Sequence, residues 1–187
     1  MTFDPQPTLH GSLVDLRPLR AEDFPALYGV ARDPKVWEQH PSPDRYTYRV
    51  YSEFFKEAMA SKGALLVRDA KNGRVIGSSR YHGYDADKRE VEVGWTFLAR
   101  SHWGGTYNHE MKQLMLRHAF QSVDRVLFLI GADNARSRKA VENIGGTVVG
   151  AKADFDGAER VLYALTADVF ANGLGARKTF TAPRPNS

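Results

Sequence analysis

The chain has 187 residues, of which 42% are hydrophobic and 26% charged, as is usual for a single globular domain. It has no cysteine, which excludes disulfides, thiolate metal sites and a cysteine nucleophile. The 26 basic and 22 acidic residues give a net charge of +4, which fits an anionic ligand better than a nucleic-acid groove. Apolar runs are too short for a membrane span, and the first residues lack the pattern of a signal peptide, so we expect a cytoplasmic protein.

The first third of the chain predicts one strand and two helices. Residues 1–10 contain two prolines and no periodicity, so we expect a loose arm. An alternating pattern over 12–19 predicts a strand, and helices are expected to begin near Glu22 and to include Tyr51. The loop over 37–46 between these helices is rich in aromatic and ionisable residues, and such loops often bind ligands.

The middle of the chain predicts a three-stranded antiparallel meander that ends in a glycine-containing turn. Alternation predicts strands over 64–68, 75–82 and 90–98, and the first two are joined through an Asn-Gly turn. The stretch 100–108 then leads into a helix over about 109–121. The first backbone N–H groups of a helix have no intrahelical partner, and glycine lets an anion approach them. This junction is therefore either a phosphate site or an ordinary tight turn.

The last third predicts a strand, a short helix and a hairpin. The apolar run over 126–130 is typical of a strand covered on both faces. Asn134 caps a polar helix over 134–143, and strands over 147–149 and 160–165 form the final hairpin. The order of elements indicates one mixed α/β domain.

Several common functional motifs are absent from the sequence. It contains no P-loop, no G-x-G-x-x-G fingerprint and no G-x-S-x-G elbow. The six histidines have no paired spacing on a helix face, so we expect no metal site.

What remains is a set of motifs in a characteristic order, and these resemble the GNAT superfamily of N-acetyltransferases, in its RimJ/RimL-like branch. The motifs are an opening strand, an E-I-G-Y-x-L-like strand, a glycine loop and an N-x-x-S…E-K-x-G-like signature. They read Val14-Asp15-Leu16-Arg17-Pro18-Leu19, Glu92-Val93-Gly94-Trp95-Thr96-Phe97-Leu98, Trp103-Gly104-Gly105-Thr106-Tyr107-Asn108, and Asn134-Ala135-Arg136-Ser137 followed by Glu142-Asn143-Ile144-Gly145.

The resemblance covers about residues 11–170 and implies a single-domain α/β fold of the α+β mixed-sheet type. We expect a mostly antiparallel central sheet flanked by helices over residues 11–172. A flexible arm over 1–10 and a flexible tail over 173–187 would flank this domain.

Three positions depart from the family pattern. Thr106 stands where the second small residue of the loop is expected, and Ser101 where a glutamine or arginine usually begins it. Val141 occupies the position at which many members have a tyrosine general acid, so a tyrosine acid at that site is excluded.

The resemblance implies direct transfer of an acetyl group from acetyl-CoA to an amine in a ternary complex. The acceptor is either a protein N-terminus or lysine, as in the ribosomal-protein members, or a small molecule. One cation of the run Arg136, Arg138 and Lys139 would meet the 3′-phosphate, unless these residues form only a solvated helix face. The cofactor-binding candidates are Phe97, Leu98, Ala99, Arg100, Trp103, Gly104, Gly105, Thr106, Tyr107, Asn108, Asn134 and Lys139.

The catalytic candidates are few because the reaction needs only a base, a polarised carbonyl and a proton for the thiolate. The resemblance favours Glu92 over its neighbour Glu90 as the base, although either can be a solvated strand carboxylate. Ser137 is the candidate acid or thiolate donor, or else a first-turn residue of the helix. The candidates for the acceptor side are Trp37, His40, Arg80 and His82, and Trp37 is equally a candidate packing residue.

Two other functions are open at this point. The first is an acyl-CoA-binding sensor that has lost catalysis, which Thr106 and Val141 would favour. The second is RNA binding, which is weakly supported because charges do not cluster with aromatic residues. No membrane contact is expected, and a homodimer is an expectation from the resemblance alone.

Overall fold

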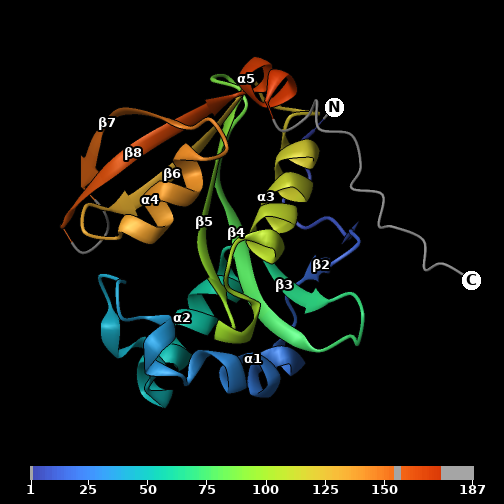
Figure 1. Cartoon of the computed structure of the whole chain (residues 1–187), viewed down its shortest axis with the longest axis vertical. Coiled ribbons are helices and arrows are strands. Elements are labelled where there is room, and N and C mark those ends of the chain that lie inside the picture. The colour runs from blue at the N-terminus through green and yellow to red at the C-terminus, as the bar shows by residue number, and fades with distance from the viewer. Residues whose placement is uncertain (1, 154–156, 174–187) are drawn as a thin grey trace, which may run out of the picture.

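The computed structural model describes residues 2–153 and 157–173 (Figure 1). Within this part the chain forms an eight-stranded sheet in the order β1-β2-β3-β4-β5-β6-β8-β7. The strands are β1 (Leu9–His10), β2 (Val14–Pro18), β3 (Ala64–Asp69), β4 (Val75–Asp85), β5 (Glu90–Leu98), β6 (Arg125–Gly131), β7 (Thr147–Ala153) and β8 (Glu159–Thr166). The helices are α1 (Phe24–Ala31), α2 (Tyr48–Ala60), α3 (Thr106–Ala119), α4 (Ala135–Glu142) and α5 (Ala167–Asn172).

The predicted fold class is confirmed. The sheet is mixed and mostly antiparallel, since β5 and β6 form a parallel pair and every other adjacent pair is antiparallel. The structure adds β1 and α5, which the sequence analysis did not predict. Helix α3 begins at Thr106, three residues before the predicted start at His109, and Gly105 occupies its N-cap position.

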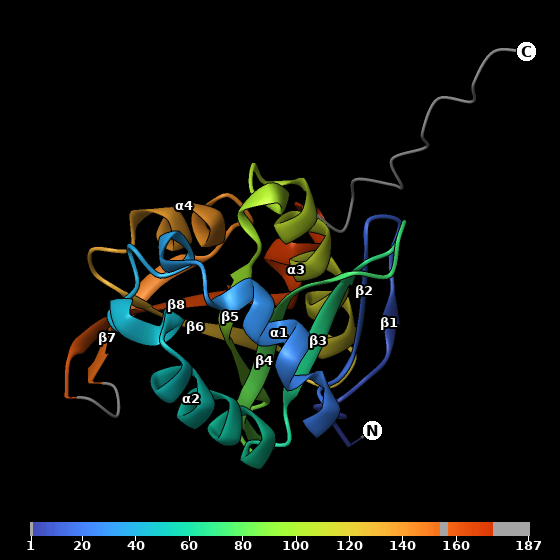
Figure 2. The same cartoon turned by 90° about the horizontal axis from the view of Figure 1, so that it is seen from below.

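The helices cover both faces of the sheet (Figures 1 and 2). Helix α3 lies on one face, and α1 and α2 lie together on the other. Strand β3 is buried on both faces: Leu65 and Val67 belong to the core cluster of α3, and Ala64 and Leu66 to that of α1 and α2. This arrangement explains why the sequence of β3 is an apolar run rather than an alternating one.

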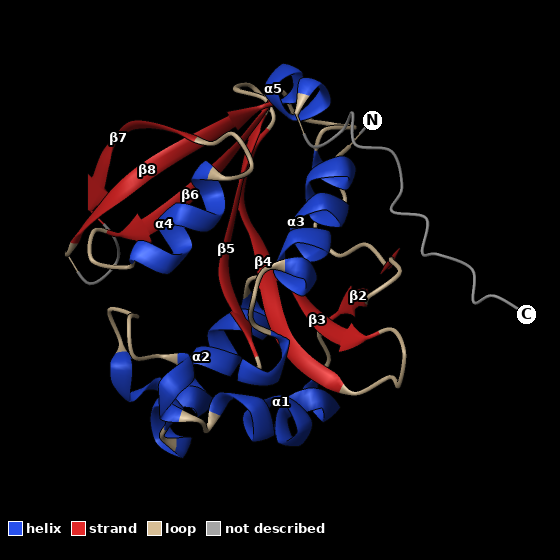
Figure 3. Ribbon diagram, in the orientation of Figure 1, coloured by secondary structure: helices blue, strands red, loops and turns tan. Residues whose placement is uncertain are grey.

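Strands β5 and β6 pair only over their first residues and then diverge, which opens the sheet (Figure 3). The paired residues are Glu90 with Arg125, Val91 with Val126, and Glu92 with Leu127. Beyond them β5 contains a bulge at Trp95, whose φ is +51°, and its register with β4 shifts between Ser78 and Arg80. A bulge bends a strand and increases its twist, so this one accompanies the separation of β5 from β6.

The expectation of a loose arm over residues 1–10 is wrong for the described residues 2–10. The Phe3 side chain is only 5% exposed, and its ring packs edge-on against Tyr81 at 5.1 Å. The carbonyl oxygen of Asp4 accepts a hydrogen bond of 2.7 Å from Nε2 of His118, and β1 pairs with β2. The predicted flexible tail lies outside the described residues from 174 onward.

Replacing Phe3 with alanine is expected to lower the free energy of unfolding by about 3 kcal/mol, since it empties a buried aromatic site. Chemical denaturation measures this change, and Thr2→Ala, at an exposed neighbouring position, is the matched control. Equal stability of the two variants would show that the N-terminal segment contributes little to the fold.

No helix in the described part of the chain has both the length and the apolar character needed to cross a bilayer.

Candidate functional site

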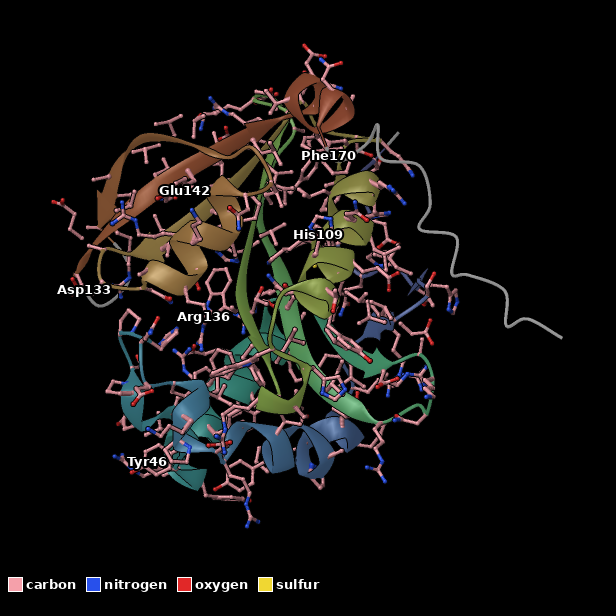
Figure 4. The ribbon with its side chains drawn as sticks, viewed as in Figure 1. Tyr46, His109, Asp133, Arg136, Glu142 and Phe170 are labelled. Carbon is pink, nitrogen blue, oxygen red and sulfur yellow. The ribbon has the colours of Figure 1, made fainter. Side chains whose placement is uncertain are left out.

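A cavity of about 760 Å³ lies where β5 and β6 separate. Its walls come from β5, β6, the start of α3, one side of α4 and the segment from Val36 to Arg45. Figure 4 shows Arg136 of α4 in the region between α4 and the N-terminal helices, and Arg136 belongs to the cavity wall. The opening in the sheet is therefore a continuous space that reaches from the α3–α4 side to the α1–α2 side.

The turn before α3 has the geometry of an anion site. Gly104 and Gly105 have φ values of +104° and +108°, a region that L side chains rarely adopt, and a β-carbon at either would meet nothing within 4 Å. The first intrahelical bond runs from His109 N to Gly105 O, so the amides of Thr106, Tyr107 and Asn108 precede the helical ladder. Gly104, Gly105 and Asn108 line the cavity, which brings the positive end of the helix dipole to its rim.

The Asp69 carboxylate fixes this turn on both sides. Its Oδ2 atom lies 3.1 Å from Nε2 of His102, before the glycines, and accepts a 3.5 Å hydrogen bond from the hydroxyl of Tyr107, after them. Its Oδ1 atom accepts a 2.8 Å bond from the amide of Lys71. The hydrogen bond from His102 holds the pKa of Asp69 below its usual range. The carboxylate therefore stays charged and keeps both side chains in place near neutral pH.

The start of α4 forms the opposite wall. Asn134 caps the helix, as predicted, with Oδ1 accepting a 3.1 Å bond from the amide of Ser137. Asn134, Ser137 and Lys139 line the cavity, as does the buried Val141. The guanidinium of Arg136 lies 4.1 Å from the centre of the Trp103 ring, so a cation–π contact connects the two walls.

The two candidate bases lie in different surroundings. Glu92 lines the cavity at the last residue of the β5–β6 pairing, and its cross-strand partner on β4 is His82. Glu90 forms an ion pair with Arg125, whose Nε donates a 3.0 Å bond, and this pair lies outside the cavity wall. The geometry therefore favours Glu92 over Glu90.

Three acceptor-side candidates share the cavity wall. His40 accepts a 3.0 Å bond from the amide of Ser42 through Nδ1, and His82 packs against the ring of Trp95 at 5.1 Å. Trp37 also belongs to the wall, but it is 2% exposed and donates a 2.7 Å bond from Nε1 to the carbonyl of Ala31. Trp37 therefore packs in the core and also lines the cavity.

The remaining candidates lie behind the wall or beside it. Arg100 forms an ion pair with Asp33 at 2.5 Å, and the amide of Ala99 donates to the carbonyl of Ile76. Arg80 is buried, with its guanidinium 4.7 Å from the Trp95 ring, and burial lowers its pKa to about 10. The other predicted residues of the wall are Phe97 and Leu98, whereas Thr106 and Tyr107 follow the turn without lining the cavity.

The structure adds residues that the sequence analysis did not select. Lys112 of α3 and Glu57 of α2 line the cavity, and so does Arg45, whose guanidinium lies 4.2 Å from the Phe54 ring. A signal for Lys112 was present, since it lies three and four residues before the buried Met115 and Leu116 on one helix face.

Within the described residues, no group of three or more histidine or carboxylate side chains is placed to hold a metal ion.

Comparison with known proteins gives one family and many similar structures. Residues 14–147 match the family model described as an acetyltransferase (GNAT) domain. A crystal structure described as an acetyltransferase is 27% identical, with a TM-score of 0.77 over 95% of this chain and 97% of that one. An acetyltransferase from T. thermophilus is also 27% identical, with a TM-score of 0.72 over 92% and 97% of the two chains.

A third structure, Mycobacterium smegmatis RimJ in complex with CoA-disulfide, is 19% identical, with a TM-score of 0.66 over 87% of each chain. At that identity the similarity concerns the fold alone. A comparison with curated protein sequences finds no significant match.

Proposed function

Because this chain belongs to the GNAT acetyltransferase family, we propose that it transfers the acetyl group of acetyl-CoA directly to an amine. Family membership itself supports acyl transfer from an acyl-CoA to an amine, whereas the choice of acetyl and the direct route are parts of the proposal. The single observation that supports it most is the glycine turn at the start of α3, which opens onto the cavity between the diverging strands.

In this proposal the turn binds the pyrophosphate of the cofactor. Backbone amides at a helix start are suited to phosphate oxygens, and the glycines leave the approach open. The unpaired edges of β5 and β6 beyond Glu92 offer main-chain groups to the amides of the pantetheine arm. Lys139 and Arg136 of α4 then supply positive charge for the remaining phosphate.

The acceptor amine approaches from the side of α1 and α2, where His82, His40 and Glu57 line the cavity. Glu92 takes the proton of the amine, directly or through water, as the nitrogen attacks the thioester carbon. A C–N bond forms and the C–S bond breaks, so the thiolate leaves without an acyl-enzyme. The chain has no cysteine for a thioester intermediate, which supports this direct route.

Titration calorimetry with acetyl-CoA, followed by a thiol-release assay over a panel of amines, tests the proposal. No binding at millimolar acetyl-CoA would contradict it. Binding without turnover on peptide N-termini, lysine peptides and small amines would instead identify an acyl-CoA-binding module without catalysis.

With the best acceptor, Glu92→Gln is expected to lower kcat at least about 100-fold, as loss of a general base does. Glu90→Gln is the matched variant, two residues away on the same strand face. A larger loss of kcat in Glu90→Gln than in Glu92→Gln would show instead that Glu90 is the base.

Three finer parts of the hypothesis stay predictions. They are membership of the RimJ/RimL-like branch, a cytoplasmic location and a homodimer. The acceptor screen addresses the first of these, because that branch includes enzymes for the N-termini of ribosomal proteins.

A further inference from the structure

A lysine side chain is buried in the wall of the cavity. Lys112 of α3 is 8% exposed, and its Nζ donates a 2.7 Å hydrogen bond to Oγ1 of Thr96 on β5. The same nitrogen lies 5.8 Å from the centre of the Phe128 ring on β6, so it spans the space between the two diverging strands. Lysine is almost never buried to this degree without an ionic partner, because burial disfavours the charged form.

Lys112 and Glu92 reach the cavity from opposite faces of the sheet. Val91 and Val93 of β5 pack in the core cluster that contains Met111 and Met115 of α3. Since neighbouring residues of a strand point to opposite faces, Glu92 points to the α1–α2 face, as does its cross-strand partner His82. The bulge at Trp95 reverses this alternation, so Thr96 faces α3, where it accepts the hydrogen bond from Lys112.

Lys112 is also suitably placed along the helix. It follows Thr106, the first residue of α3, by six residues, which is about 9 Å along the helix axis. A cofactor held by its pyrophosphate at the glycine turn has to extend from that turn into the gap between β5 and β6. Lys112 lines the cavity along this path.

We propose that Lys112 is a catalytic residue that donates a proton to the thiolate sulfur of coenzyme A when the C–S bond breaks. This inference rests on the proposed function. In the step, the electron pair of the C–S bond goes to sulfur and one proton passes from the Lys112 ammonium to that sulfur. The products are the thiol of coenzyme A and neutral Lys112, which regains a proton from solvent before the next turnover.

The surroundings suit this role. Burial alone lowers the pKa of Lys112 to about 7, below the value of about 8.5 for an ordinary thiol, so the proton transfer is downhill. The other charged groups that line the cavity are not among the causes of this shift; they are Arg45, Glu57, Glu92, Arg136, Lys139, Lys152 and Arg160. Thr96 is itself held by Ser79 of β4 through a 2.7 Å contact between hydroxyl oxygens, which fixes the position of the ammonium.

The position of Val141 gives a second reason. It is buried and lines the cavity from α4, and its side chain has no proton to donate. Ser137, the other candidate donor, is a neutral hydroxyl at the first turn of α4. An ammonium on α3 supplies both a proton and a positive charge to the departing thiolate.

The pH dependence of kcat with the best acceptor tests the proton transfer. An acid with a pKa of about 7 loses its proton above that pH, so kcat of the wild-type protein should fall as the pH rises through about 7. This fall should be absent from Lys112→Met. Arg117→Met, which removes an exposed cation from the same helix, is the control and should match the wild type.

A kinetic measurement separates this role from a structural one. Lys112→Met is expected to lower kcat about 100-fold with little change in the KM for acetyl-CoA, and its melting temperature should equal or exceed that of the wild type. If kcat of Lys112→Met fell above about pH 7 as it does in the wild type, this would overturn the role of Lys112 and leave the proposed function intact. Failure of the wild-type protein to bind coenzyme A would overturn both.

Discussion

Replacing Gly105 with valine is expected to weaken acetyl-CoA binding about 1000-fold while the protein remains folded. Gly105 has a φ of +108° at the position that caps α3, and valine does not adopt this conformation without strain. The turn would therefore change its path, and the amides of Thr106 and Tyr107 would no longer converge. Loss of two charge-assisted hydrogen bonds, at about 2 kcal/mol each, corresponds to the expected loss of affinity.

Gly73→Val provides the matched control for this experiment. Gly73 also has a positive φ, +72°, and no atom lies within 4 Å of a β-carbon built on it. It belongs to the turn between β3 and β4 and does not line the cavity. Both variants should lose similar stability in thermal unfolding, and only Gly105→Val should lose binding in calorimetry. Equal affinities for acetyl-CoA in the two variants would show that the phosphates bind elsewhere.

The second large effect concerns the fold. Gly77→Ala is expected to lower the free energy of unfolding by at least about 4 kcal/mol, a loss seen only for specific structural conflicts. A methyl group on Gly77 would lie 2.0 Å from the carbonyl oxygen of Phe97 on the neighbouring strand. A backbone oxygen cannot move away without disturbing the pairing of Gly77 with Leu98, and Phe97 packs against Trp37 at 4.9 Å. The end of β5 that forms the cavity wall would be displaced as well.

Gly150→Ala is the corresponding control, because Gly150 lies in exposed strand β7 with nothing within 4 Å of the added carbon. Denaturant unfolding of both variants measures the difference. If Gly77→Ala were as stable as Gly150→Ala, β4 and β5 would be able to separate at little energetic cost.

The order of strands and helices was predictable because each element contains its own periodic signal. The strands of the meander alternate or form apolar runs, and the helix starts have recognisable caps such as Asn134. The burial of Phe3 was not predictable in this way, because its partners Tyr81 and His118 lie far along the chain. Contacts of this kind depend on the tertiary arrangement, which no local pattern contains.

The same distinction applies to the site. The glycine turn could be located from the sequence because positive φ values and a helix start leave a local signature. The ion pair of Arg100 could not be predicted from the sequence, because its partner Asp33 is brought beside it only by the packing of the N-terminal segment. Lys112 was missed for a related reason. Its spacing places it on the apolar face of α3, but a lysine on a helix is usually solvated, and the burial of this one follows from the packing of α3 against the sheet.

The contacts of Asp69 have a consequence for protein engineering. A hairpin tip with an Asn-Gly turn, such as the one over 70–74, is normally a favourable place for inserting a tag or a linker. Here the hairpin begins at the carboxylate that holds His102 and Tyr107 on either side of the glycine turn. An insertion there would alter the support of the glycine turn before α3. The turn between β4 and β5, where Ala86, Asp87 and Lys88 are exposed, is the better site for grafting.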